Sequence, residues 1–194
     1  LLQGEVGSGK TLVAVLAICQ AVEAGAQAAV LVPTETLAEQ HLRTLDALLA
    51  PAGLAPVLLT GRIPRAEAER RRMAMRTGTA AVIVGTQALL SEGVSFDRLG
   101  LVVVDEQHRF GVEQRQALAE TATGREGAAH LLYMTATPIP RTLAMTAYAD
   151  LDVSVIDELP PGRTPVRTVV LPDARRDEVV ARIDAACRAG RQAY

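Results

Sequence analysis

The sequence predicts an α/β fold with a mostly parallel β-sheet, and three observations carry the prediction. Short runs of Val, Ile and Leu alternate with segments of helical periodicity, which is typical of a parallel sheet covered on both faces. Residues 4–11 (GEVGSGKT) match the phosphate-loop pattern G-x-x-x-x-G-K-[ST] without a mismatch. Residues 99–105 (LGLVVVD) form an apolar run that ends in an aspartate. Together they predict a nucleoside triphosphate site at the carboxyl edge of the sheet.

The pattern of apolar residues predicts the elements in order. Of the 194 residues, 49% are hydrophobic, enough for a sizeable buried core. Leu1 and Leu2 are expected to be the stub of a strand, so we expect the chain to be a piece of a longer protein. Further strands are expected at residues 28–32, 56–59, 80–84, 100–104 and 130–134, and helices at 10–24, 35–50, 63–77, 111–123 and 139–148.

A connector is predicted where this alternation breaks. Residues 157–162 (DELPPG) contain two prolines and a glycine, a composition typical of a link between domains. We therefore expect one domain over residues 1–156, with its N-terminal strand truncated. Residues 157–194 are expected to hold the connector and the start of a second α/β domain. That start comprises a strand at 166–171 and a helix from Asp173 to Arg188 capped by Gly190.

Each residue type in the phosphate loop has a physical role. The glycines let the backbone curl so that its N–H groups point inward, and the helix that follows adds the positive end of its dipole. Lys10 is expected to reach the β and γ phosphates, and the Thr11 hydroxyl to bind Mg²⁺. The candidate nucleotide-binding residues are Gly4, Glu5, Val6, Gly7, Ser8, Gly9, Lys10 and Thr11.

Two carboxylates follow the clearest buried strand. Mg²⁺ takes one or two carboxylates and keeps several waters, so Asp105 is expected to hold the metal through water. Glu106 is the candidate base that orients and polarises the water attacking the γ phosphate. Acidic pairs in this position also occur as ordinary helix N-caps, but the phosphate loop upstream favours catalysis. The catalytic candidates are thus Lys10, Asp105 and Glu106.

Thr135 and Thr137 close another apolar strand. Side chains two residues apart on an extended segment point the same way, so both hydroxyls are expected to face Glu106 and His108. We interpret the segment as a coupling element in which His108 hydrogen-bonds to one of the threonines and Arg141 passes the signal on. A surface salt bridge is the alternative for Arg141. Taken alone, the same residues also fit a plain strand end and turn.

These motifs together resemble the first motor domain of the superfamily-two helicases, which has a RecA-like P-loop NTPase fold. Within that group the chain resembles the RecG family. The resemblance continues through residues 32–41 (VPTETLAEQH), 105–112 (DEQHRFGV), 134–141 (MTATPIPR) and 157–163 (DELPPGR). Mfd-like translocases have similar motifs and are the second possible family. They typically have Glu-Gln where this chain has Gln107-His108. PriA helicases lack the Arg-Phe-Gly-Val extension.

The resemblance implies a motor driven by ATP and Mg²⁺ that moves on double-stranded DNA. Such motors remodel stalled forks and branched junctions, including Holliday junctions, in recombination and repair. It implies that a second RecA-like motor domain and a DNA-wedge domain belong to the same polypeptide. DNA phosphates are expected at Thr34, Thr60, Gly61, Gly85 and Thr86, through backbone N–H groups and small hydroxyls that read no base sequence. An ordinary turn after a strand is the alternative at each position.

Composition and charge limit the other possibilities. The net charge of −2 gives no global field for nucleic acid, so DNA contacts must be local. No apolar run approaches the length of a membrane span, so we expect a cytoplasmic protein without a membrane partner. The resemblance to the RecG family implies a bacterial one. The most basic stretch, residues 62–76, is expected to be a helix face paired within itself, as Glu67 with Arg71 and Glu69 with Arg72. Arg62 and Arg65 are better candidates for a phosphate.

Two further side chains have plain interpretations. His41 is expected on a helix surface. Phe110 is expected to anchor the core, with a DNA-sensing element as the alternative.

Two other classes of protein share the phosphate loop. A small-molecule kinase would use an arginine-bearing lid in the same domain, and would not explain residues 105–108 followed by 135–137. A binding module that holds ATP as a switch would have no need of Glu106.

Overall fold

The computed structural model describes residues 1–106, 110, 123–124, 127–137, 151–158 and 166–193. The chain divides into two compact units, Leu1–Pro160 and Pro161–Tyr194, and each is described by itself. The candidate residues His108 and Arg141 lie outside the described residues. Among the described helices, none is both long enough and apolar enough to cross a lipid bilayer.

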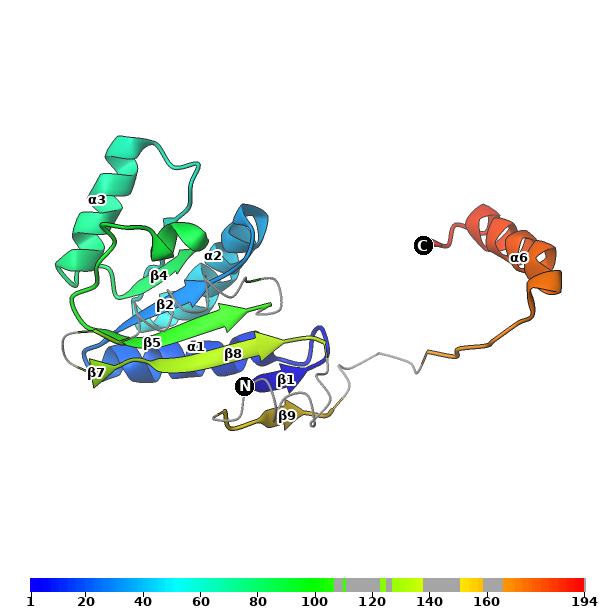
Figure 1. Ribbon diagram of the computed structural model, residues 1–194, viewed down its shortest axis with the longest axis horizontal. Helices are drawn as coiled ribbons and strands as arrows, with labels where there is room; N and C mark the ends of the chain where they lie inside the picture. Colours follow the sequence, from blue (N-terminus) through cyan, green and yellow to red (C-terminus); the bar gives the residue numbers. More distant parts are fainter. Residues whose placement is uncertain (107–109, 111–122, 125–126, 138–150, 159–165, 194) are drawn as a thin grey trace. The chain divides into compact units, whose positions relative to one another are not determined.

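A seven-stranded sheet forms the centre of the first unit (Figure 1). Its strand order is β3-β4-β2-β5-β8-β1-β9, and every pairing in it is parallel. The predicted α/β fold with a mostly parallel sheet is confirmed. The strands are β1 (Leu2–Gly4), β2 (Gln27–Leu31), β3 (Val57–Leu59), β4 (Val82–Gly85), β5 (Leu99–Asp105), β8 (His130–Thr135) and β9 (Ser154–Ile156).

The strands agree with the sequence pattern, with two additions. All five full strands expected are present, with ends within two residues of the expected ones. A separate antiparallel pair, β6 (Thr123–Gly124) and β7 (Gly127–Ala128), was not expected. Strand β9 was not expected either, because its three residues are too few to show a periodicity.

Three helices accompany the described strands, as predicted. They are α1 (Lys10–Glu23), α2 (Glu35–Leu49) and α3 (Arg65–Arg76). Two short 3₁₀ turns are also present: η1 (Ala50–Ala52) follows α2, and η2 (Gln87–Leu90) follows β4. Helix α2 begins where the Thr34 hydroxyl accepts a hydrogen bond from the Leu37 N–H at 3.3 Å. The helix expected at 139–148 lies outside the described residues. So does the one expected at 111–123, except that its last residue, Thr123, opens β6.

The sheet is buried on both faces because successive strand residues point to opposite sides. Odd and even positions therefore enter two separate clusters. One contains Val30, Val82 and Val103 with the buried residues of α1 and α2. The other contains Leu31, Ile83 and Val102 with residues of α3 and η2, and with Phe110, which is 7% exposed. The core-anchor interpretation of Phe110 is confirmed.

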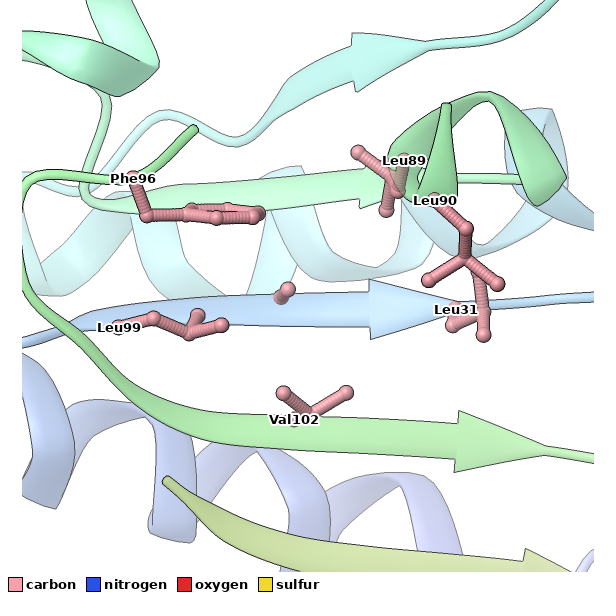
Figure 2. Close-up of a pocket in the computed structure, with 7 residues that line it drawn as sticks. Leu31, Leu89, Leu90, Phe96, Leu99 and Val102 are labelled. Atoms are coloured by element: carbon pink, nitrogen blue, oxygen red, sulfur yellow. The ribbon is translucent and has the colours of Figure 1, made fainter. Parts of the chain in front are cut away.

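A small apolar cavity lies within the second of these clusters (Figure 2). Its volume is about 10 Å³, which is at the lower limit for one water molecule. Every lining residue is apolar, so the cavity is a packing gap and offers nothing to orient a ligand. The lining residues are Ala29, Leu31, Leu89, Leu90, Phe96, Leu99 and Val102.

The basic helix α3 pairs its charges on its own surface, as expected. The Arg71 Nε lies 2.9 Å from a Glu67 carboxylate oxygen, and Arg72 lies 3.6 Å from Glu69. Arg70 also bonds Glu67. The hydrogen bond from Arg70, followed by that from Arg71, lowers the pKa of the Glu67 carboxyl. These guanidinium groups therefore already have carboxylate partners.

The described part of the second unit contains one 3₁₀ turn and one α-helix. A 3₁₀ turn η4 (Asp173–Arg175) leads into α6 (Arg176–Arg188). Gly190 has a φ of 77° and its N–H donates to the Cys187 carbonyl at 2.9 Å, which confirms the predicted cap. The strand expected at 166–171 is wrong, since residues 166–172 have no regular structure. A strand needs a neighbour to accept its backbone hydrogen bonds, and no described strand pairs with this segment.

The buried amide of Gln27 joins three segments at the amino edge of the sheet. Its Nε2 donates to the carbonyl oxygens of Met75 at 2.9 Å and Ala80 at 2.7 Å. Its Oε1 accepts from the N–H groups of Asp97 at 2.8 Å and Arg98 at 3.1 Å. The residue is 3% exposed. One side chain thus satisfies four backbone groups at the ends of α3 and at the entry to β5.

Replacing this amide by a hydrocarbon should destabilise the fold. Gln27→Leu removes four hydrogen bonds to backbone groups, two of them buried, and we expect a loss of about 3 kcal/mol in the free energy of unfolding. Urea titration followed by circular dichroism measures it. Gln20→Leu, at an exposed position of α1, is the matched control and should leave the midpoint nearly unchanged. Equal midpoints for both variants would contradict the role of Gln27.

Candidate nucleotide-binding site

The parallel register brings three sequence motifs to one edge of the sheet. Asp105, the last residue of β5, is opposite Met134 of β8, and Met134 is opposite Leu2 of β1. Gln3 is opposite Thr135, and β1 ends at Gly4. Since neighbouring strands are about 4.8 Å apart, the end of β5 and the phosphate loop are separated by about 10 Å. Figure 1 shows the arrowheads of β5, β8 and β1 at the same edge.

The phosphate loop connects β1 with α1, which is the context that the motif requires. Gly7 and Gly9 have φ angles of 84° and 96°, a region that favours glycine. A Cβ on Gly4 would lie 2.5 Å from the Ser8 Oγ, so the loop folds this tightly only with glycine there. The first turn of α1, with its N–H groups, starts at Lys10 directly after the loop.

Two polar groups of the loop fit a bound phosphate. The Lys10 Nζ donates to the carbonyl oxygens of Gly4 and Glu5, each at 2.8 Å, so the ammonium lies across the loop. A phosphate would offer it charged and therefore stronger acceptors. The Ser8 Oγ is buried and has no hydrogen-bond partner within the described part of the chain. Buried hydroxyls are normally satisfied, and a phosphate oxygen in the loop would supply the partner.

Asp105 and Glu106 occupy the tip of β5. The Asp105 Oδ1 accepts the Glu106 N–H at 3.0 Å. Among the described residues other than glycine, Glu106 alone has a positive φ, of 53°. This conformation costs an L-residue on the order of 1–2 kcal/mol, and such strain clusters at functional sites. The turn sets Glu106 at the sheet edge beside Asp105.

Thr135 ends β8, and the chain bends at residues 136 and 137. The Oγ1 atoms of Thr135 and Thr137 lie 3.0 Å apart, and the Thr137 N–H donates to the Thr135 Oγ1 at 3.2 Å. Thr135 is 2% exposed, whereas Thr137 is exposed. The two hydroxyls therefore meet through the strand end and turn that the sequence offered as the alternative, and not through the alternation of an extended segment. The expected contact with His108 falls outside the described residues.

His41 is the residue of this site that sequence reasoning missed. Its Nε2 lies 2.8 Å from the Asp105 Oδ2, and only 12% of its side chain is exposed. The expectation of a helix-surface position is wrong. His41 follows Ala38 by three residues and precedes Leu45 by four, and both of these are buried on the inner face of α2. This helical spacing was the available signal.

The comparisons with known proteins agree with this geometry. Residues 1–146 match the DEAD/DEAH box helicase family. The chain belongs to this helicase family. It is 56% identical over its full length to the ATP-dependent DNA helicase RecG of Acidithiobacillus ferridurans, and 54% identical to that of Escherichia coli K12. The chain spans 28% of the length of each of these relatives.

A solved helicase structure supports the same relation. The structure of RecG bound to a three-way DNA junction matches 97% of this chain and 25% of that one, with 42% identity and a TM-score of 0.79. The RecA-like fold and the resemblance to RecG helicases are thereby confirmed. Membership of the DEAD/DEAH box helicase family implies the use of a nucleotide.

The predicted DNA contacts lie in three loops, which follow β2, β3 and β4. These three strands are neighbours in the sheet. Thr34 is exposed and caps α2. Glu35 accepts the Arg62 N–H at 3.2 Å and pairs with its guanidinium, so it ties the loop containing Gly61 to the start of α2. Thr60 and Thr86 are 7% and 8% exposed, so their hydroxyls are largely covered in this structure.

Gly85 is confined by packing. A Cβ there would lie 2.3 Å from the Leu59 carbonyl oxygen and 2.8 Å from the Leu89 Cγ. The Gly85 carbonyl accepts the Val32 N–H at 3.0 Å, and the Thr86 N–H donates to Leu59 at 3.3 Å. The ends of the three strands are therefore held close together by this glycine.

Adding a methyl group at Gly85 should lower the melting temperature of the protein more than adding one at Gly61. Gly85→Ala must push β3 away from β4, and we expect it to lower the melting temperature by about 5 °C, equivalent to roughly 2 kcal/mol. Gly61→Ala is the control, because its Cβ would meet only the Glu35 carboxylate, at an ordinary 3.6 Å. Differential scanning calorimetry measures both, and equal melting temperatures would show that the sheet can relax around Gly85.

Proposed function

We propose that this chain is the ATP-binding part of a DNA translocase of the RecG type. The motor would hydrolyse ATP with Mg²⁺, move along double-stranded DNA, and remodel stalled forks and branched junctions in the bacterial cytoplasm. The observation that carries the proposal is the meeting of the phosphate loop, Asp105 and Thr135 at one sheet edge, in a chain 56% identical to a RecG helicase. Gln107 and His108 favour this over an Mfd-like motor.

The described residues suggest how the chemistry would be divided. Lys10 would exchange its contacts with Gly4 and Glu5 for the β and γ phosphates, and the α1 amides would hold them in place. Thr11 and Asp105 supply the oxygen atoms that Mg²⁺ prefers. Mg²⁺, when bound, neutralises charge that develops on the phosphate oxygens. Glu106 would accept the proton of the attacking water.

The partners of this chain are also part of the proposal. DNA phosphates would meet the loops containing Thr34, Gly61 and Gly85, where contacts position the motor without reading base sequence. The second motor domain would supply arginine residues to the γ phosphate, which in related phosphoryl transfer contribute several orders of magnitude in rate. A wedge domain of the same polypeptide would give the junction preference. The similar RecG bound to a three-way DNA junction supports a branched DNA as the partner.

Substitutions at Lys10 and Glu106 in the full-length protein should have different effects. Lys10→Ala removes the charge that bridges the β and γ phosphates and should abolish DNA-stimulated ATP hydrolysis. Glu106→Gln keeps the shape of the side chain without the base, so Mg-ATP should bind with nearly wild-type affinity while turnover falls by about 10² or more. Steady-state phosphate release and titration with a fluorescent ATP analogue measure the two quantities.

Glu69→Gln is the matched control for Glu106, because Glu69 lies exposed on α3. It should change neither quantity. Turnover of Lys10→Ala within threefold of wild type would refute the assignment of the loop. An equal loss of nucleotide affinity and turnover in Glu106→Gln would refute the role as base.

The hydroxyl pair of Thr135 and Thr137 is expected to couple hydrolysis to movement. Replacing both with Ala should leave much of the ATP hydrolysis intact, whereas fork unwinding should fall at least fivefold further, because the link from the γ phosphate to the DNA loops is lost. The measurement is ATP consumed per base pair unwound, with folding checked by thermal melting. A proportional fall in both activities at unchanged stability would mean that the pair serves chemistry or binding.

A further inference from the structure

The pair formed by His41 and Asp105 is not part of any motif that sequence reasoning joined. The two residues are 64 positions apart, and their side chains meet at 2.8 Å with 12% and 17% of their surfaces exposed. Because an ionised carboxylate only accepts hydrogen bonds, the imidazole Nε2–H is the donor. A charge-assisted bond at this depth is stronger than one on the open surface.

The contact completes the hydrogen bonding that orients Asp105. Its Oδ1 accepts the backbone N–H of Glu106 at 3.0 Å, and its Oδ2 accepts from His41 at 2.8 Å. One donor on each oxygen fixes the plane of the carboxylate. Each oxygen keeps a second lone-pair direction, which a water of a hydrated metal can use.

His41 is itself rigidly placed by its helix. Ala38, Leu45 and Leu49 hold the inner face of α2 against the sheet with 0–1% exposure. The helix is anchored at its start by the Thr34 cap and by the pairing of Glu35 with Arg62. His41 lies seven positions after Thr34, a rise of about 10 Å along the helix. The imidazole is therefore presented to Asp105 from a fixed support.

We propose that His41 is a positioning residue that holds the Asp105 carboxylate in the orientation needed to bind hydrated Mg²⁺. The proposal rests on the proposed function, in which Asp105 is the metal-holding residue. The chemistry is that of an outer-shell partner: such side chains touch no substrate, but they fix the direction in which a ligand presents its oxygens, and their loss commonly weakens metal binding by 10–100-fold. Without His41, the Asp105 carboxylate can rotate about its χ angles, and only some of the resulting orientations can bind the metal.

The test compares side chains that differ in whether they can place an N–H donor at the position of the imidazole Nε2. In the full-length protein with ADP, Mn²⁺ serves as the probe, and its free concentration is read by electron paramagnetic resonance. His41→Gln has a donor of similar reach, whereas His41→Asn keeps the polarity but is too short. His41→Ala removes the group. Gln40→Ala, at the exposed neighbouring position of α2, is the control for helix effects.

We expect Mn²⁺ to bind about tenfold more weakly to His41→Asn and His41→Ala, and within threefold of wild type to His41→Gln and Gln40→Ala. In steady-state ATP hydrolysis, the Mg²⁺ concentration for half-maximal rate should rise about tenfold in His41→Asn, while the rate at saturating Mg²⁺ stays within threefold of wild type. A purely structural role would instead lower the melting temperature and would not be relieved by Mg²⁺.

The proposal is overturned if folded His41→Asn binds Mn²⁺ within threefold of wild type, or if folded His41→Gln binds as weakly as His41→Asn. Asp105→Asn separates this failure from a failure of the proposed site. If Asp105→Asn weakens Mn²⁺ binding and His41→Asn does not, only the positioning role is wrong. If neither weakens it, the assignment of Asp105 to the metal is wrong, and the inference about His41 fails with it.

Discussion

The register of the parallel strands β5, β8 and β1 is the constraint on which the candidate site depends. Asp105, Met134 and Leu2 lie in one row across the three strands, and the phosphate loop and Thr135 follow within two residues of that row. Strand side chains alternate with a period of two, so a slip of one residue in β8 would turn Thr135 to the opposite face and replace it with its apolar neighbour. The buried apolar runs that fix this register are thus also what assembles the chemistry.

Within that frame, short local contacts set the direction of each functional group. The two positive-φ glycines curl the phosphate loop, the Asp105 carboxylate accepts the N–H of its own neighbour, and the backbone at Glu106 is held in a conformation that an L-residue adopts at a cost. The carboxylate pair therefore depends on the turn at the strand end, while α2 contributes a long-range contact to Asp105 through His41.

How far the sequence could predict this depends on the range of the interaction. The ends of β2, β5 and α2 follow from local apolar periodicity, and the strand end and turn at Thr135 and Thr137 follow from the local sequence around Pro138. The contact of His41 with Asp105 requires knowing how α2 lies over the sheet, which local pattern does not contain. The expected strand at 166–171 failed because β structure is decided by a partner strand, whereas Gly190 was predictable because a helix cap is local.

The neighbours of β1 also determine when the nucleotide site can exist during folding. Strands β2, β4 and β5 pair with one another using residues up to Asp105, so a hydrophobic core can form from that part of the chain. Among the strands that the structure describes, β1 pairs with β8 and β9 alone, and the first of these partner residues along the chain is Met134. Contacts between such distant residues close late. On the ribosome the phosphate loop is therefore synthesised well before the strands that complete its site, and a nascent chain can be partly folded before it can hold ATP.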